Sequence, residues 1–148
     1  MASIFNVSKY ILQKKGKMTT MKLQKLAYYC QAWSLVWEGV PLFDEEFQAW
    51  ANGPVNPELF SFHKGQFVID ASKFEAFPDY SFSPAEIETL DSALNHYGDR
   101  DPQWLSELTH KERPWKEARA GVPVGEQCAN IIEKEIMQEY YGGLSDAE

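Results

Sequence analysis

The sequence predicts a mainly α protein, with residues 1–148 forming a single compact domain of six or seven helices and at most a short strand pair. Three observations lead to this prediction. Apolar residues recur at intervals of three and four along most of the chain, which is the period of an amphipathic helix. Helix-start and helix-stop residues separate these stretches. The 148 residues are 44% hydrophobic and 14% aromatic, which is enough for one core at this length.

The first two helices are predicted over residues 7–15 and from Thr19 or Thr20 to Gly39. Gly16 supplies the stop for the first helix, and either threonine can cap the second. The second carries a wide apolar stripe over about five turns and is therefore expected to be the central core helix. Its inward residues are Leu23, Leu26, Ala27, Cys30, Trp33 or Ser34, and Trp37.

The middle of the chain is predicted to alternate short helices and loops. Asp44 can cap a short helix that carries Phe47, Trp50 and Ala51 and ends at residues 52–54. Asn56 as the N-cap and Pro57 at the first helical position begin another, which ends at residues 64–65. Residues 67–69 are the only segment with strand character, and residues 71–82 are predicted to form an ordered loop.

The second half has the clearest start signal, a capping box formed by Ser83 and Glu86 around Pro84. The helix that it opens ends at Gly98. Asp101 opens the next helix, Pro114 interrupts it, and a further turn begins there. A loop over 121–125 precedes a last helix over 126–141, and a flexible tail is predicted over 142–148. The predicted inward residues are Ile87, Leu90, Leu94 and Tyr97 in the helix after Ser83, and Cys128, Ile131, Ile132, Ile136 and Tyr140 in the last helix.

The charge balance limits the classes of partner. With 14 basic and 22 acidic residues the net charge is −8, which argues against a nucleic-acid binder and favours steering toward a basic partner. The basic residues at 14, 15, 17, 22 and 25 are expected to form a solvated helix end. The longest apolar-rich stretch, residues 26–40, is too short to cross a membrane, and no secretion signal is visible. We therefore expect a cytoplasmic protein with no membrane partner.

No catalytic or metal site is predicted. His63, His96 and His110 fall in three separate helices, and none stands at metal-ligand spacing from another histidine or a cysteine. No cofactor motif is present. The acidic run at 44–46 is explained by the dipole of the helix predicted to begin there. Cys30 and Cys128 are interpreted as small buried hydrophobic residues in a reducing compartment.

Three segments are more specific in combination. They are residues 22–29 (KLQKLAYY) with Trp33; residues 41–57, which contain PLFDEE, AW and GPV; and residues 105–110 (LSELTH) with the Pro114–Trp115 pair. In this order and at these spacings they resemble the Panacea domain of SocA-like antitoxins, a family that also includes phage-associated proteins. The resemblance runs from about residue 7 to residue 141.

This resemblance implies a mainly α antitoxin without enzymatic activity or cofactor. It implies neutralisation of a cognate protein toxin, encoded nearby, by direct protein–protein contact. A housekeeping protease is a second implied partner, because the SocA-like antitoxin delivers its toxin to one. The alternative is a phage-associated interaction module or proteolytic adaptor, and a third reading is a hydrolase or transferase built from scattered residues.

Candidate partner-binding residues come from the three segments and, for Phe60, from the helix that follows the second segment. Trp and Tyr are enriched at interface hot spots, and the chain has more aromatic residues than one core of this length needs. Each of the three segments can also be explained by structure alone. Residues 22–33 would be a core helix with a polar rim, and Gly53–Pro54 a rigid corner between two helices. Residues 110–115 would be a helix end against which a tryptophan packs. The candidates are Tyr28, Trp33, Trp50, Gly53, Pro54, Val55, Pro57, Phe60, His110 and Trp115.

Overall fold

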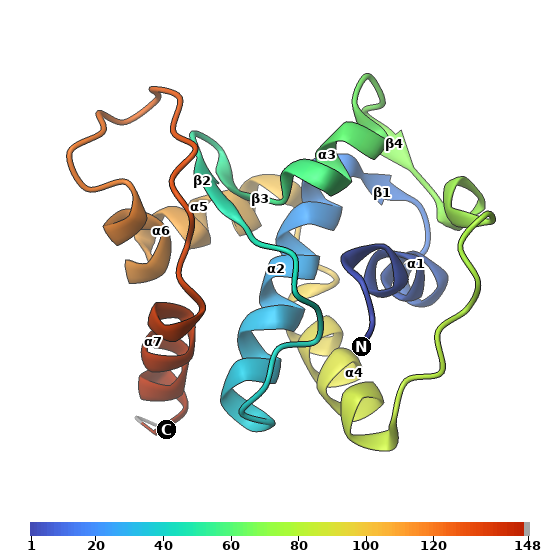
Figure 1. Ribbon diagram of the computed structural model, residues 1–148. Coiled ribbons are helices and arrows are strands. Elements are labelled where there is room, and N and C mark those ends of the chain that lie inside the picture. The colour runs from blue at the N-terminus through green and yellow to red at the C-terminus, as the bar shows by residue number, and fades with distance from the viewer. Residues whose placement is uncertain (147–148) are drawn as a thin grey trace.

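The computed structural model describes residues 1–146, and this part of the chain contains seven α-helices arranged around a central one, α2 (Thr20–Trp37). In Figure 1, α7 lies on one side of α2, whereas α1 and α4 lie on the other. The mainly α fold class is therefore confirmed. The other helices are α1 (Ile4–Lys15), α3 (Pro57–His63), α4 (Pro84–Tyr97), α5 (Pro102–Lys111), α6 (Arg113–Ala118) and α7 (Lys134–Asp146).

Helix α2 is buried on almost every side rather than along one stripe. It begins where the sequence predicted, with the side chain of Thr19 accepting the backbone N–H of Lys22. A helix that is apolar all round belongs inside a domain, and α2 contributes most of its side chains to the core. Five polar side chains of this helix are buried with it: Thr20, Gln24, Lys25, Gln31 and Ser34.

The predicted caps at Asn56, Ser83 and Asp101 are confirmed, each accepting a backbone N–H of the first turn of its helix. Helix α1 begins one turn earlier than predicted because Ser3 forms a capping box with Asn6. An Asn at the third position replaces the usual Glu or Gln of that motif, so the sequence pattern was missed. Ile87 of α4, predicted to point inward, is 38% exposed.

Residues 48–55 form a β-hairpin, so the helix predicted after Asp44 is wrong. Strand β2 (Gln48–Trp50) pairs antiparallel with β3 (Gly53–Val55). Burial alternates along Phe47, Gln48, Ala49 and Trp50, which is the period of a strand and not of a helix. The expected strand character near residues 67–69 is confirmed, since β4 (Val68–Ile69) pairs with β1 (Met18–Thr19). The loop predicted over 71–82 includes one 3₁₀ turn, Ala71–Phe74.

The last helix is displaced relative to the prediction. Residues 119–133 form a long loop, and α7 begins only at Lys134. Cys128 is therefore half-buried in a loop, Ile131 is exposed, and Ile136 and Tyr140 are half-buried. The inward side chains are instead those of Ile132, Met137 and Tyr141. Of the predicted tail over 142–148, residues up to Asp146 continue α7, and residues 147–148 lie outside the described part.

A buried hydrogen-bonded group, which we call the tyrosine–glutamate cluster, joins α7 to α2. The hydroxyls of Tyr29 and Tyr141 each donate to Glu112 at 2.7 Å, and the Tyr28 hydroxyl lies 3.1 Å from that of Tyr141. Burial raises the pKa of Glu112, and the two tyrosine bonds oppose that rise. Every member has a partner, so the cluster is a closed polar network inside the core.

Candidate partner-binding site

Most of the predicted site residues gather around the β2–β3 hairpin, at the end of α2 where that helix begins (Figure 1). We call this region the hairpin corner. Its members from the predicted set are Trp50, Gly53, Pro54, Pro57, Phe60, His110 and Trp115. Tyr28 and Val55 are buried in the core, at 1% and 0% exposure, so their side chains act from inside the protein. Trp33 lies toward the other end of α2, where its indole N–H donates to Tyr97 at 2.9 Å.

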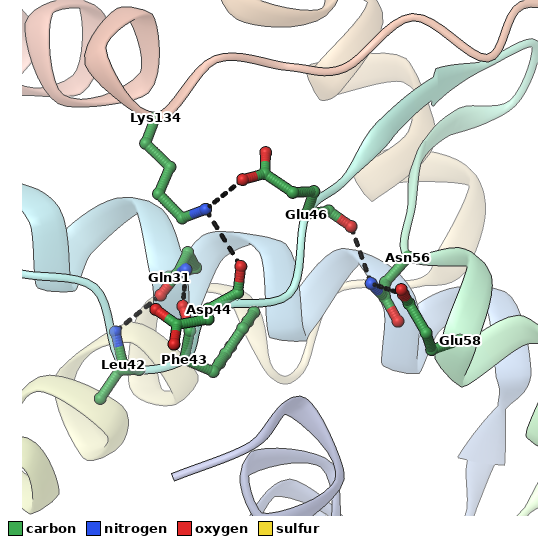
Figure 2. A network of polar contacts seen from close by, with 8 residues as sticks. All are labelled: Gln31, Leu42, Phe43, Asp44, Glu46, Asn56, Glu58 and Lys134. Atoms are coloured by element: carbon green, nitrogen blue, oxygen red, sulfur yellow. Dashed lines mark hydrogen bonds and ion pairs between the residues drawn. The ribbon is translucent and has the colours of Figure 1, made fainter. Parts of the chain in front are cut away.

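The segment that leads into the hairpin is held extended by side chains from other elements (Figure 2). Gln31 of α2 accepts the backbone N–H of Leu42 and donates to the carbonyl of Phe43, both at 2.7 Å. The Asn56 side chain donates to the carbonyl of Glu46 at 2.7 Å. These bonds take up backbone groups that a helix would have used internally, which is why no helix forms here.

The acidic run at 44–46 therefore has a different role from the one predicted. With no helix beginning there, the helix-dipole explanation does not apply. Figure 2 shows Lys134 reaching across to this run, where it pairs with Glu46 at 2.8 Å and donates to the carbonyl of Asp44 at 3.3 Å. Glu45 accepts the backbone N–H of Ile4 at 3.1 Å. The carboxylates at 45 and 46 thus tie the chain before the hairpin to α1 and α7.

Gly53 lets the hairpin approach α2 and α5 closely. Its φ is +122°, and a Cβ at this position would lie 2.6 Å from Cε of Lys25 and 3.0 Å from Oγ1 of Thr109. The Ser106 hydroxyl donates to the carbonyl of Asn52 at 2.7 Å and fixes the turn from the other side. The predicted rigidity at Gly53–Pro54 is thus present, but it belongs to a hairpin and not to a corner between two helices.

Aromatic rings frame the hairpin. Trp50 packs edge-on against Phe60 with ring centroids 4.9 Å apart. On the other side His110 stacks on Trp115 at 4.2 Å, and the Trp115 indole donates to the carbonyl of Trp50 at 2.8 Å. Because Trp115 binds the strand directly, its first role is to fix β2, and Trp50 remains half-buried at the surface.

Arg119 fixes the loop beside β2, a role that the sequence reasoning missed. Its guanidinium is buried and donates to three backbone carbonyls, those of Ala49, Pro123 and Glu126. The returning chain then pairs with β2, since Ala49 donates to the carbonyl of Asn130 at 2.9 Å. An arginine with its fork of donors is suited to this task, and only the fold shows which carbonyls it meets.

A surface hollow of about 590 Å³ opens between the hairpin and this loop. Trp50 forms part of its wall, Met21 of α2 reaches it from below, and Cys128 faces it from the loop. The complete lining is Met21, Gln48, Trp50, Ala51, Asn52, Gln127, Cys128 and Ala129. The lining is mostly apolar with a few amide groups, which is typical of sites that receive a side chain or a small ligand.

Lys25 lies beneath the hairpin and is not part of a solvated cluster as predicted. It is 1% exposed, and its Nζ has no hydrogen-bond partner within the described residues. Burial lowers the pKa of this amine to about 7, because the charged form loses its hydration. No local sequence signal marks this burial: residues on every side of this part of α2 pack inward, and Lys25 is enclosed with them.

Two histidines accompany Lys25. His63 is buried, with its Nε2 3.0 Å from the Gln24 amide nitrogen, and Gln24 also binds the backbone of Asn56. The Nε2 of His110 is buried and has no partner within the described residues. Burial lowers the pKa of both histidines, and the positive charge of Lys25 lowers them further. The corner thus gathers basic nitrogens, two of which find no hydrogen-bond partner in the part of the chain that the structure describes.

In the part of the chain that the structure describes, no three His, Cys, Asp or Glu side chains come together as metal ligands would. None of the described helices has the length and apolar character to cross a membrane. What the hairpin corner offers chemically is an apolar hollow with buried basic groups behind it.

Comparison with known protein families identifies the class. The family model described as "Antitoxin SocA-like, Panacea domain" matches residues 23–116, which is more than half of the chain. The chain therefore belongs to the SocA-like Panacea family, as the three sequence segments indicated, although the match is shorter than the range of 7–141 expected for the resemblance. Comparisons with curated proteins and with solved structures gave no match.

The matched range has a structural meaning. It runs from the first turn of α2 to α6, so it includes the hairpin, Lys25, His110 and Trp115. Helices α1 and α7, and the loop that carries Cys128, lie outside it. The family segments therefore converge on the hairpin corner, whereas one wall of the hollow comes from outside the matched range.

Proposed function

We propose that this protein is an antitoxin that neutralises a cognate protein toxin by direct, stoichiometric binding, and that it binds through the hairpin corner. Membership of the SocA-like antitoxin family supports a protein partner. The observation that carries the choice of surface is the apolar hollow beside Trp50, because it lies where the family segments meet. Both proteins would meet in the cytoplasm.

The hairpin corner has the physical properties of a binding surface. Its backbone is fixed by Ser106, Arg119 and Trp115, so little conformational entropy remains to be lost when a partner binds. Tryptophan is enriched at interface hot spots, since it buries a large area with two rotatable bonds, and Trp50 lies half-buried beside the hollow. The net charge of −8 would speed the approach of a basic toxin.

The first experiment tests the function itself. The product of the neighbouring gene is expressed alone and together with this protein, and growth and co-purification are measured. We expect toxicity, rescue, and a complex of fixed stoichiometry. Rescue by substoichiometric protein without a complex would contradict the proposal, because it would indicate turnover by an enzyme. A fall in toxin level on co-expression would support the further proposal of delivery to a protease.

The second experiment locates the surface. Trp50→Ala should weaken toxin binding by about 2 kcal/mol or more if Trp50 is a hot spot. Trp37→Ala is the matched control, because Trp37 is 46% exposed at the opposite end of α2. It stacks there on Trp33, the one exposed or half-buried candidate residue that lies away from the hairpin corner. A loss with Trp37→Ala and none with Trp50→Ala would move the interface to that end.

Cys128 supplies an independent probe of the same surface. It faces the hollow, whereas the other cysteine, Cys30, is buried and has its pKa raised by burial to about 12. A maleimide should therefore label Cys128 first in the free protein. Bound toxin should slow that labelling at least tenfold, and an unchanged rate in a stable complex would exclude the hollow from the interface.

A further inference from the structure

The amine of Lys25 is the one basic group of the hairpin corner that is almost fully buried and yet unpartnered within the described residues. A buried charge without a partner is costly, and proteins ordinarily pair it or hydrogen-bond it. Here the neighbouring basic groups, His63 and His110, supply no negative charge. The carboxylate of Glu107 acts on His110, and no carboxylate among the described residues pairs with Lys25.

The position of Lys25 connects it to the hollow. Side chains on a helix lean toward its N-terminus, so the Lys25 stem leans over the turn that carries Met21. Met21 lies four residues earlier on the same helix face and lines the hollow. On the other side, Gly53 packs against the Lys25 stem, and its neighbours Ala51 and Asn52 line the hollow as well.

The hairpin turn forms part of the cover over the amine, since Gly53 packs against the end of the lysine stem. Asn52 at the hairpin turn is exposed, and Gly53 next to it has no side chain with which to close the site. The lysine stem has four rotatable bonds, so a change of rotamer toward Met21 would bring the ammonium to the wall of the hollow. The His110 Nε2, also unpartnered within the described residues, lies on the α5 side of the same corner.

We propose that the hairpin corner binds a carboxylate side chain of the toxin, with Lys25 Nζ as its ion-pair partner. The proposal rests on the proposed function, since it names the chemistry of the group that the antitoxin recognises. An acidic chain with a net charge of −8 repels carboxylates at most of its surface. A carboxylate would therefore be accepted at this corner and rejected elsewhere, which gives orientation as well as affinity.

The test compares two lysines of α2. Lys25→Met keeps the apolar stem and removes the amine, and Lys22→Met removes the same charge from a half-exposed position one turn earlier. Both variants are checked for fold by circular dichroism and thermal melting, and their Kd for the purified neighbouring toxin is measured. We expect Lys25→Met to melt at the same or a higher temperature and to bind at least about thirtyfold more weakly. Lys22→Met should change Kd by less than about threefold.

A double-mutant cycle identifies the partner group. Each acidic residue on the toxin face is changed to its amide, and the affinity is measured against wild type and Lys25→Met. One toxin carboxylate should lose at least tenfold with wild type and almost nothing with Lys25→Met. If no acidic position shows this coupling, the carboxylate is not the ligand and the proposal is wrong.

The remaining outcomes separate the two proposals. If wild type forms the complex and Lys25→Met binds as tightly, the carboxylate site is refuted and the antitoxin function stands. If wild type forms no complex, the antitoxin function fails and the carboxylate site falls with it. Inorganic phosphate is the last probe: if it raises the melting temperature of wild type but not of Lys25→Met, while toxin affinity is insensitive to Lys25, the corner binds a small anion and the protein carboxylate is excluded.

Discussion

Two polar clusters are buried against the same helix, and they differ in whether they are complete. Around Tyr28 and Tyr29 of α2, the tyrosine–glutamate cluster satisfies its members within the chain. One turn earlier, Lys25 is just as deeply buried and has no hydrogen-bond partner among the described residues. A buried polar network in which every group has a partner adds to the stability of the fold. A buried charged group without a partner reduces that stability, and we interpret its presence as a sign of another role, such as binding. The comparison separates what holds the fold from what is available for binding.

The largest effect should come from breaking the closed cluster. Glu112→Ala leaves the hydroxyls of Tyr29 and Tyr141 without their acceptor and should cost about 3 kcal/mol of unfolding free energy. Denaturant unfolding measures this loss. Glu112→Gln is the matched control, since its amide oxygen can still accept and no charge is buried, and it should cost less than about 1 kcal/mol. Equal losses in both variants would show that the charge itself, and not the acceptor, holds the cluster.

The open cluster should respond with the opposite sign. Lys25→Met removes a buried amine and should raise the unfolding free energy by about 2 kcal/mol at pH 7. Between the folded pKa of about 7 and the ordinary value of 10.5, the unfolded chain binds a proton that the folded chain does not. Wild-type stability therefore rises with pH through that window, and the advantage of the variant shrinks.

Denaturant unfolding of both proteins at pH 7 and at about pH 9 checks this pH dependence. The interval is informative because the lowered pKa values of His63 and His110 place their titration below it, and burial places that of the core tyrosines above it. An advantage that does not change between the two pH values would mean that Lys25 stays protonated in the folded chain up to pH 9, so that its pKa is not lowered.

A smaller effect should come from closing the space over Lys25. Gly53→Ala adds a Cβ 2.6 Å from Cε of Lys25 at a φ of +122°, and should cost about 1.5 kcal/mol. Gly65→Ala is the control, because Gly65 also has a positive φ but has open space around its Cβ position, and it should cost about 1 kcal/mol. Thermal melting gives both values, and toxin affinity should fall only for Gly53→Ala. A fall for neither would leave Gly53 with a structural role alone.

The sequence predicted most of the helical frame because its signals are local. Side chains at Thr19, Asn56, Ser83 and Asp101 cap helices within three residues of themselves, so a short window of sequence contains the whole interaction. The hairpin was missed because its causes lie far away in the chain: Gln31, Asn56 and Asn130 take up the backbone groups of residues 42–49. The last helix was placed too early for the same kind of reason, since Arg119 holds the preceding loop.

The site was predicted in part. The family segments brought Trp50, Gly53, His110 and Trp115 to one place, although spacing alone could not show that Tyr28 and Val55 are sealed in the core. Lys25 was assigned to a solvated cluster because lysines are almost always exposed. Its burial follows from the way α4, α5, α7 and the hairpin surround α2, which only the assembled fold reveals.

The smallest effect should come from the support of the hollow. Arg119→Lys keeps the positive charge but loses the fork that reaches the carbonyls of Ala49, Pro123 and Glu126, and should cost about 1 kcal/mol. Hydrogen exchange should rise in residues 120–130 and stay unchanged in α2. Exchange that rises equally in α2 would show that the loop and the core unfold as one unit.

The pairing of Gln48 with Ile131 has a consequence for how the chain folds while it is being synthesised. The ribosome delivers the hairpin long before it delivers the segment that borders β2, so on every newly made chain the outer edge of that strand is uncovered for a time. Throughout that interval Ala49 and Phe47 have backbone groups free to pair with any other extended chain. Translation speed over the second half of the message would therefore set how long each nascent copy is exposed to mispairing and to proteases.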